Sequence, residues 1–398
     1  MASKKPTFVG RAVQYLKREG ASKFVSRLVR PSSWHPKHDV RVQFAFVQAP
    51  PVGLPAESVA PEPMTVNWVM PPFPKGSGGH QNICRFVYML EKRGFRCCIV
   101  VAAGPWFGTP EDVRERIRSW FFPVDASVVL GIENAPPAHI TIATAWMTAY
   151  DVRRFQSTRH RCYFVQDLEL LFFAAGSGSA FCEATYGFGF EGITAGSWLE
   201  KKLAVDYGMR TRSVGFSCDR SIYWPRPRQD MRRRIFFYGR PSSERRAFEL
   251  GLLVLEHVCK SHDDLEVIFA GGDLDEFEIP FTHRCVGIMD FEGLALLYSE
   301  CDVALVLSMT NLSLLPLELM ACGVPLVSNR APCTEWLLTD ENAQLAAPTI
   351  EALRDAVCEV LDNPQRREQL RAAGLTAAAN TSWDREGDKM AAILASLG

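Results

Sequence analysis

Long apolar runs are scarce in this sequence, although 47% of its 398 residues are hydrophobic. The richest run, residues 97–107, is broken by Gly104 and Pro105 and falls short of the roughly 18 residues that a membrane-spanning helix needs. The first residues, MASKKPTFVGR, also lack the apolar core of a secretory signal. We therefore expect a cytoplasmic protein, with enough apolar content for two or three domains of about 150 residues each.

A net charge of one sign is missing as well, because 44 basic side chains face 45 acidic ones. Nucleic-acid binders carry a strongly basic surface, so no nucleic-acid partner is expected. The twelve cysteines form no C-x-x-C pair, and the eight histidines show no metal-ligand spacing. Apolar neighbours such as those in FRCCIVV are typical of reduced core thiols. The sequence therefore predicts neither a metal site nor cysteine redox chemistry.

Residues 1–40 form a basic arm. Nine Lys or Arg side chains face only Glu19 and Asp39 there, giving nine minus two, or +7. Val9 and Val13 begin an intermittent apolar helical face, and such a basic amphipathic segment can lie on an anionic membrane surface. The other interpretation is a solvated helix on the main body or a partly disordered arm. The first interpretation predicts peripheral contact with the inner face of a membrane.

Short β-branched runs alternate with helical periods from residue 41 onward. Ile83, Phe86, Val87 and Leu90 have the i, i+3, i+4, i+7 spacing of a helix, which Gly94 should end. Alternation of this kind indicates a parallel sheet covered by helices on both faces. The expected strands of this block cover residues 41–47, 65–69, 98–102, 126–130, 140–143, 162–165 and 192–194.

A second alternating block follows the proline-rich YWPRPRQD at 223–230. The fold class is therefore α/β, with two Rossmann-like, doubly wound domains whose strand ends face an interdomain cleft, where a ligand should bind. The expected parts are an arm (1–40), two domains (41–218 and 219–380), and a C-terminal helix crossing back to the first domain (381–398). Within the second block we expect strands at 265–270, 303–307 and 325–328 and helices at 245–259, 294–300 and 314–321.

The most informative segment is DVALVLSMTNLSLLPLELMACGVPLVSNRAPCTEWL, residues 302–337. A buried strand runs into the polar turn 308–313 and then into a helix, so free backbone N–H groups should face a phosphate or a sugar hydroxyl. Glu318 stands in an otherwise apolar helical run, where a carboxylate is costly unless it binds something such as a ribose diol. The alternative is a glutamate that faces water or pairs with a cation.

The stretch LELMACGVPLVS resembles the signature helix of the retaining GT-B glycosyltransferases of family 4. That family has two glutamates separated by seven residues: the second contacts the nucleotide ribose and the first the donor sugar. Glu318 matches the second position, whereas the first falls on Thr310. The segment IFFYGRPSSERR matches the family's phosphate grip through Gly239, Arg240 and Arg245, with Arg245 in place of the usual lysine. Arginine forks suit a diphosphate and offset the charge of the leaving group.

The loop PPFPKGSGGHQN, residues 71–82, precedes the first predicted helix, and its glycines permit close approach of a ligand. An ordinary tight turn is the alternative. The segment 163–209, with Q-D-x-E, A-T-Y-x-F-G-F and T-A-G-x-W-L, is similar to a bacterial branch of family 4 that contains rhamnosyltransferases for surface glycans. Its aromatic side chains are expected mainly in the core, namely Phe172, Phe173, Phe188 and Phe190.

The resemblance implies a set of site residues. Catalytic roles fall on Arg240, Arg245, Gln166 and Asp167. Donor contacts fall on Gly78, Gly79, Gly239, Gly271, Gly287, Ile288, Thr310, Asn311, Leu312, Ser313 and Glu318. Acceptor contacts fall on Lys75, His80, Glu183 and Tyr186. The D-x-D at Asp273 and Asp275, which binds a metal in another class of glycosyltransferase, is expected to be a solvated loop here.

The resemblance implies transfer of L-rhamnose from dTDP-L-rhamnose to a glycan or lipid-linked glycan acceptor, with retention of configuration and without metal or cofactor. The diphosphate would depart on the face that the acceptor attacks and would itself take the acceptor proton. Three alternatives remain open at this point: a UDP- or GDP-hexose donor, a nucleotide-sugar epimerase on the same scaffold, and a non-catalytic partner that binds a glycan or nucleotide.

Overall fold

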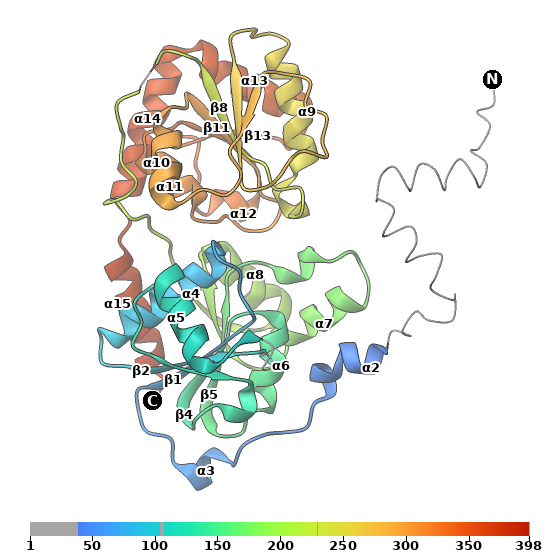
Figure 1. Ribbon diagram of the computed structural model, residues 1–398, viewed down its shortest axis with the longest axis vertical. Helices are drawn as coiled ribbons and strands as arrows, with labels where there is room; N and C mark the ends of the chain where they lie inside the picture. Colours follow the sequence, from blue (N-terminus) through green and yellow to red (C-terminus); the bar gives the residue numbers. More distant parts are fainter. Residues whose placement is uncertain (1–38, 104–106, 229, 398) are drawn as a thin grey trace, which may run out of the picture. The chain divides into compact units, whose positions relative to one another are not determined.

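The computed structural model describes residues 39–103, 107–228 and 230–397 (Figure 1). The described residues fall into two units, with the boundary between Gln48 and Ala49. In the smaller unit, α2 (Val40–Gln43) and the 3-10 helix η1 (Ala45–Gln48) replace the strand predicted at 41–47, which is wrong. Asp39 accepts a hydrogen bond from the Arg41 backbone N–H at 3.0 Å and so caps a helical turn. The amphipathic helix predicted within residues 1–38 lies outside the described residues.

The larger unit begins with a first domain built on a seven-stranded parallel sheet, in the order β3-β2-β1-β4-β5-β6-β7. The strands are β1 (Thr65–Met70), β2 (Arg96–Val101), β3 (Ser127–Leu130), β4 (Ala138–Ala143), β5 (Thr158–Val165), β6 (Glu191–Ala195) and β7 (Arg210–Val214). The helices are α3 (Ala56–Val59), α4 (Gly78–Glu91), α5 (Pro110–Trp120), α6 (Trp146–Arg154), α7 (Ser177–Tyr186) and α8 (Ser197–Tyr207), with 3-10 turns η3 (Ile132–Asn134) and η4 (Glu169–Phe172).

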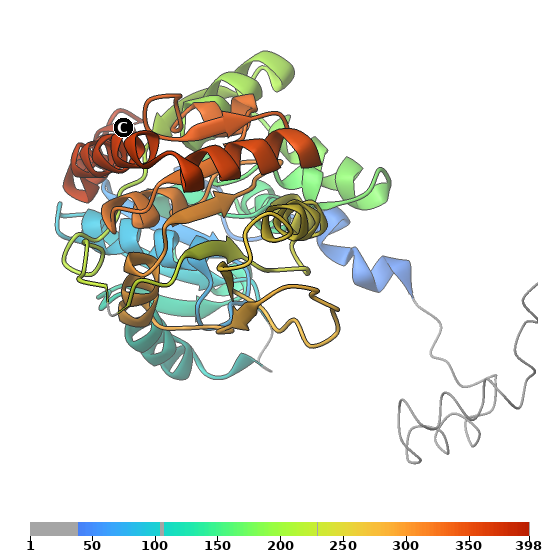
Figure 2. The same ribbon diagram turned by 90° about the horizontal axis from the view of Figure 1, so that it is seen from above.

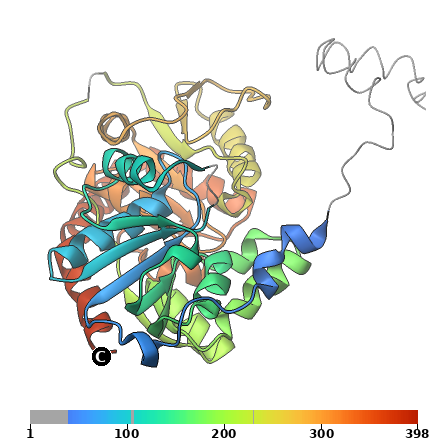
Figure 3. The same cartoon turned by 60° about the horizontal axis from the view of Figure 1, so that its bottom comes forward.

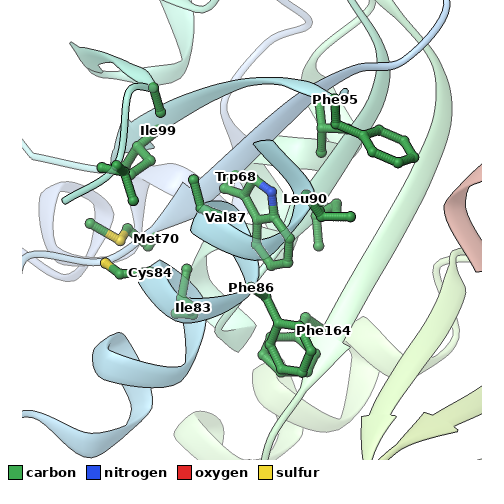
Figure 4. Packing of buried hydrophobic residues seen from close by; sticks show 14 of the residues in the cluster. Trp68, Met70, Ile83, Cys84, Phe86, Val87, Leu90, Phe95, Ile99 and Phe164 are labelled. Carbon is green, nitrogen blue, oxygen red and sulfur yellow. The ribbon is translucent and has the colours of Figure 1, made fainter. Parts of the chain in front are cut away.

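The helix predicted from the 83–90 spacing is confirmed as α4, and its four apolar positions are buried. They pack on the sheet around Trp68 and Phe164, whose rings meet edge to face at 6.0 Å between centroids (Figure 4). Burial of this apolar face supplies most of the stability of such a helix. Gly94, with φ +85°, ends the turn that leads into β2.

A second domain follows, built on a six-stranded parallel sheet in the order β10-β9-β8-β11-β12-β13. The strands are β8 (Arg234–Tyr238), β9 (Glu266–Ala270), β10 (His283–Cys285), β11 (Val303–Val306), β12 (Leu326–Asn329) and β13 (Gln344–Ala346). The helices are α9 (Phe248–Cys259), α10 (Phe291–Ser299), α11 (Leu315–Ala321), α12 (Pro332–Glu335), α13 (Ile350–Asp362) and α14 (Pro364–Ala379), with the 3-10 turn η5 (Glu244–Arg246).

Helices cover both faces of the second sheet, as Figure 2 shows for the orange strands and their neighbours. One buried cluster joins the sheet to α9 and α13, and another joins it to α10 and α11. Strand orders of this kind, with every strand pair parallel, define a doubly wound sheet. Both predicted doubly wound domains are therefore confirmed.

The last helix, α15 (Trp383–Ala395), packs on the first domain. Met390, Ile393 and Leu394 belong to the same buried cluster as β1 and α4, and the Arg93 guanidinium contacts the Asp388 carboxylate at 2.8 Å. Figure 3 brings the first domain forward, with its blue and green strands and α15 in dark red. The chain therefore crosses between the two domains twice. No helix in the described ranges is long and apolar enough to span a bilayer.

Candidate active site

The strand orders place a switch point in each sheet, between β1 and β4 and between β8 and β11. Neighbouring strands at a switch point send their connections to opposite faces, which opens a crevice at the carboxyl ends of the strands. The loop at 71–77 leaves β1, the segment at 239–247 leaves β8, and the turn at 308–313 leaves β11. The three segments singled out in the sequence therefore all leave strands that flank a switch point.

The loop after β1, residues 71–77, is called the glycine loop here. Its two ends are joined by hydrogen bonds to the neutral side chain of His80. Ser77 Oγ lies 2.7 Å from His80 Nδ1, and His80 Nε2 lies 3.2 Å from the Pro71 carbonyl oxygen. Because a carbonyl only accepts, Nε2 carries the proton and Nδ1 accepts from the Ser77 hydroxyl. Burial lowers the pKa of His80 to about 4, with the Pro71 carbonyl opposing part of that effect. His80 was predicted to contact the acceptor, but both of its ring nitrogens form hydrogen bonds within the glycine loop.

Gly78 and Gly79 open α4 and leave backbone accessible in front of it. Among the described residues, a Cβ at Gly78 would meet no atom within 4 Å, and one at Gly79 would meet only the Gln166 amide nitrogen at 3.6 Å. Gln166 Nε2 donates to the Gly79 carbonyl at 3.1 Å, while Asn82 Nδ2 donates to Gln166 Oε1 at 3.1 Å. The end of β5 and the start of α4 are therefore tied together beside an open backbone surface.

The predicted helix 245–259 begins later than expected. Residues 244–246 form the 3-10 turn η5, and Ala247, with φ +48°, breaks the chain direction before α9 starts at Phe248. The turn carries both Arg245 and Arg246 to the edge of the sheet. The Met309 backbone N–H donates to the Arg245 carbonyl at 2.9 Å, which ties this turn to the loop after β11.

The two arginines meet a carboxylate of the first domain. Asp167 Oδ2 lies 3.3 Å from Arg245 Nε and 3.9 Å from Arg246 Nη2. The Arg245 guanidinium also lies over the Phe172 ring, 4.1 Å from its centroid. Phe172, predicted to be in the core, is instead 38% exposed, because its ring serves as this platform. Phe173, predicted likewise, is also 38% exposed, with one edge against Trp146 at 5.7 Å.

Two carboxyl groups in the Q-D-x-E segment have raised pKa values. Burial raises the pKa of Asp167, although the Arg246 and Arg245 charges oppose the rise. Burial raises the pKa of Glu169 to about 8, and the neighbouring Asp167 charge adds to it. The Trp146 backbone N–H donates to Glu169 Oε2 at 2.7 Å. Proximity of two carboxylates in a buried place is typical of functional sites.

The turn after β11 is built of buried polar groups. Arg246 Nη1 donates to Ser308 Oγ at 2.6 Å and to the Asn311 carbonyl at 2.9 Å. The buried Thr310 hydroxyl helps to lower the pKa of the Asp167 carboxyl, although within the described ranges it has no hydrogen-bond partner of good geometry. Leu312 is also buried, whereas Ser313 is exposed. Of the predicted donor contacts in this turn, Ser313 thus has the most accessible side chain.

Glu318 lies in the first turn of the short helix α11, which follows that loop. Burial raises its pKa to about 7, while the Tyr223 hydroxyl and the Arg85 charge lower it. Arg85, on α4 of the first domain, is held between the rings of Phe122 at 4.6 Å and Trp383 at 4.3 Å. Glu318 therefore lies within the electrostatic influence of a cation from the other domain; the sequence left open a cation near Glu318 but did not indicate Arg85.

Glycines pack the loops after β8 and β9 against each other. A Cβ at Gly239 would lie 2.9 Å from the Phe269 ring, and one at Gly271, with φ +108°, would lie 2.4 Å from the Tyr238 ring. The Gly271 backbone N–H donates to the Gly287 carbonyl at 2.8 Å. Ile288 is 81% exposed, and a Cβ at Gly76 would lie 3.9 Å from its Cγ2 atom. The glycine loop thus faces Ile288 of the other domain.

Four predicted residues remain, namely Arg240, Lys75, Glu183 and Tyr186. Arg240 is exposed and donates to the Tyr238 hydroxyl at 3.2 Å. Lys75 is exposed, Glu183 accepts from the Tyr207 hydroxyl at 3.0 Å, and Tyr186 is only 1% exposed. The Tyr186 hydroxyl accepts from the Glu169 backbone N–H at 3.1 Å, so its observed contacts are internal ones.

Metal ligands do not gather in the part of the chain that the structure describes: it holds no group of three or more His, Cys, Asp or Glu side chains suited to a metal. In the D-x-D segment, Asp273 Oδ1 accepts from the Asp275 backbone N–H at 3.0 Å, which forms a local turn. All twelve cysteines fall within the described ranges, and each is free.

The sequence is similar to those of known proteins. A family described as WsaF, C-terminal domain, matches residues 233–358. The O-antigen biosynthesis protein RfbC of Myxococcus xanthus is 35% identical over 348 residues, or 84% of this chain. The chain spans only 27% of the length of that relative.

Solved structures share the two-domain arrangement. Sucrose-phosphate synthase from Thermosynechococcus elongatus superimposes with a TM-score of 0.66 at 16% identity, over 84% of this chain and 98% of that one. Anabaena Alr3699/HepE, crystallised with UDP and glucose, gives a TM-score of 0.66 at 14% identity, over 83% and 99% of the two chains. At these identities the likeness concerns the fold, and this chain has the GT-B fold of two parallel-sheet α/β domains.

Proposed function

We propose that this chain is a glycosyltransferase of bacterial O-antigen or related surface-glycan synthesis. The observation that carries the proposal is the meeting of Arg245 and Arg246 with Asp167 at the carboxyl ends of two parallel sheets. A nucleoside diphosphate is the ligand class that fits guanidinium groups beside an open glycine backbone. The match to a relative named for O-antigen biosynthesis supports the choice of a glycan product.

The finer proposal is transfer of L-rhamnose from dTDP-L-rhamnose with retention of configuration. The resemblance of residues 163–209 to a rhamnosyltransferase branch supports it, and Thr310 at the position of the first signature glutamate agrees with a donor outside the common hexoses. The arginines would stabilise the charge on the departing diphosphate, which grows in the transition state. The diphosphate oxygen would take the acceptor proton as the new glycosidic bond forms.

The ribose of the donor is assigned to Glu318. Its pKa of about 7 reflects burial near Tyr223 and Arg85, and a carboxylate in such a place gains from two ribose hydroxyl donors. No step in this scheme is assigned to a metal ion or a cofactor, since the guanidinium groups supply the positive charge.

The experiment that tests the proposal is turnover with dTDP-L-rhamnose, UDP-glucose and GDP-mannose, offered with a panel of octyl glycosides as acceptors. Fastest product formation with dTDP-L-rhamnose, with the donor's anomeric configuration kept in the NMR spectrum of the product, is the expected result. Faster turnover with another donor would replace the sugar, and an inverted product would remove retention. Absence of turnover with all three donors would favour a non-catalytic partner that binds glycan or nucleotide.

A further inference from the structure

Asn311 has every hydrogen-bonding group of its side chain satisfied, and all of its donors reach the other domain. Its Nδ2 atom donates to the Gln166 carbonyl at 3.0 Å and to the Ala195 carbonyl at 2.9 Å. Its Oδ1 atom accepts from Trp336 Nε1 at 2.8 Å. The side chain is fully buried, so a lost partner would leave polar groups unsatisfied away from water.

Trp336 supplies the second half of this contact. Its ring lies against Gly196, where a Cβ would come within 2.8 Å of three ring atoms. Gly196 has φ +88° and precedes α8, so both its conformation and the lack of a side chain are required. Phe216 packs against the same ring at 6.1 Å between centroids. Gly196 and Phe216 therefore both pack against the Trp336 ring, and its Nε1 donor orients the Asn311 amide.

Asn311 fixes the backbone of Gln166, the residue that precedes Asp167. Gln166, whose carbonyl it binds, precedes Asp167 and also binds the Gly79 carbonyl through its own side chain. A continuous chain of hydrogen bonds therefore runs from the glycine loop through Gln166 and Asn311 to Trp336. On the other side, Arg246 donates to the Asn311 carbonyl at 2.9 Å.

We infer that Asn311 is a positioning residue that, with Trp336, latches the two domains together and sets the spacing between Asp167 and the arginines of η5. This inference rests on the proposed function, because the spacing matters only if a donor binds between those groups. The latch excludes water from the site and favours the acceptor over hydrolysis of the donor. A turn that looks like a ligand-binding loop in the sequence therefore serves the geometry of the site through its buried asparagine.

Three variants test the latch. Asn311→Ala removes all three side-chain bonds, whereas Trp336→Phe removes the Nε1 donor together with part of the indole and keeps an aromatic ring. Asn363→Ala is the matched control: Asn363 caps α14 within the second domain, accepting from the Arg366 N–H at 3.0 Å and donating to Glu359 at 2.8 Å. It should lower the melting temperature without opening the site.

Small-angle scattering gives the radius of gyration of each variant without any substrate. Both latch variants should have a larger radius than wild type, and Asn363→Ala should have the wild-type radius. With a turning-over donor, the ratio of donor hydrolysis to transfer should rise in the latch variants and kcat should fall about tenfold or more, since misplacement by 1 Å can cost about 100-fold.

Unchanged radius and unchanged hydrolysis ratio in Asn311→Ala would overturn the latch, as would an equal change in Asn363→Ala. If Asn311→Ala fails to fold, Trp336→Phe decides by the same two measurements. Absence of turnover in wild type would remove the proposed function and not the latch, because the scattering result stands by itself.

Discussion

At the scale of single residues, the site consists of charged groups held by a partner from the other domain. Arg245 forms an ion pair with Asp167 and a cation–π contact with the Phe172 ring, so its guanidinium is already oriented before any ligand binds. Preorganised charge of this kind is worth most where it faces charge that develops during the reaction. Arg246, by contrast, is engaged with the Ser308 hydroxyl and the Asn311 carbonyl. In the proposed scheme, Arg240 and Arg245 therefore bind the phosphates, whereas Arg246 supports the turn after β11.

Replacement of Arg245 by Ala should lower kcat by about 100-fold or more, on the scale of one lost transition-state donor. Arg245→Lys should keep only part of the wild-type kcat, because an ammonium group lacks the planar, bidentate donors of a guanidinium group. Arg354→Ala, at a half-buried residue paired with Asp355, is the control and should leave steady-state turnover unchanged. Wild-type kcat in Arg245→Ala would remove this residue from the reaction.

Glu169 makes stability depend on pH. Its pKa rises from 4.5 to about 8 on folding, so between those values the folded chain binds a proton that the unfolded chain has released. The free energy of unfolding should then fall as pH rises through that window, by about 1.4 kcal/mol per pH unit at most. Thermal melting at pH 5 and pH 8.5 measures it. Glu169→Gln should show a smaller loss, and parallel curves for the two proteins would contradict the assignment.

At the scale of elements, the glycine loop presents backbone to a ligand. A Cβ at Gly78 would meet no atom of the described residues within 4 Å, and the φ of Gly78 is not in the left-handed region. Gly78→Ala should therefore keep the wild-type melting temperature while weakening binding of the donor diphosphate about tenfold, because the new methyl group fills the ligand's space. Titration calorimetry measures that affinity.

The control for this change is Gly187→Ala at the end of α7, where a Cβ would likewise be free of clashes, with its nearest atom at 3.6 Å. It should alter neither stability nor donor affinity. Equal affinity of Gly78→Ala and wild type would mean that the diphosphate does not approach this loop.

How far the sequence predicts the elements depends on whether the signal is local. The i, i+3, i+4, i+7 pattern of α4 and the buried strand β11 could be read directly, since burial of one face dictates both. The break at Ala247 could not, because nothing in its neighbours demands a left-handed alanine. The helix predicted from 245 therefore starts at Phe248, and that shift is what turns Arg245 toward Asp167.

Contacts between the two domains could not be predicted from the sequence for a different reason. Asn311 and Ala195 are 116 positions apart, and no periodicity reports such a pairing. Arg246 has a signal in the sequence, the doubled arginine of SSERR, and Arg85 has another, a cation within the apolar ICRFV stretch. Either signal points to a residue of interest without indicating its partner.

At the scale of the whole molecule, the described residues from 49 onward have the GT-B fold. The basic arm, residues 1–40, carries a prediction of its own. The +7 charge of residues 1–40 predicts binding to anionic vesicles. Cosedimentation with phosphatidylglycerol vesicles should pellet the full chain and leave a chain lacking residues 1–40 in solution. Equal pelleting of the two would remove the arm from any membrane contact, and high salt should weaken the binding of the full chain.

The central claim is that the two domains together bind a nucleotide-sugar donor between the glycine loop, the arginines and Glu318. Calorimetric titration with dTDP-L-rhamnose, compared with UDP-glucose and with the free nucleotides dTDP, UDP and GDP, tests it most directly. The account predicts preferential binding of dTDP-L-rhamnose that persists in EDTA and is lost in Arg245→Ala and Glu318→Ala. Absence of binding by every nucleotide would contradict it and would return both residues to structural roles.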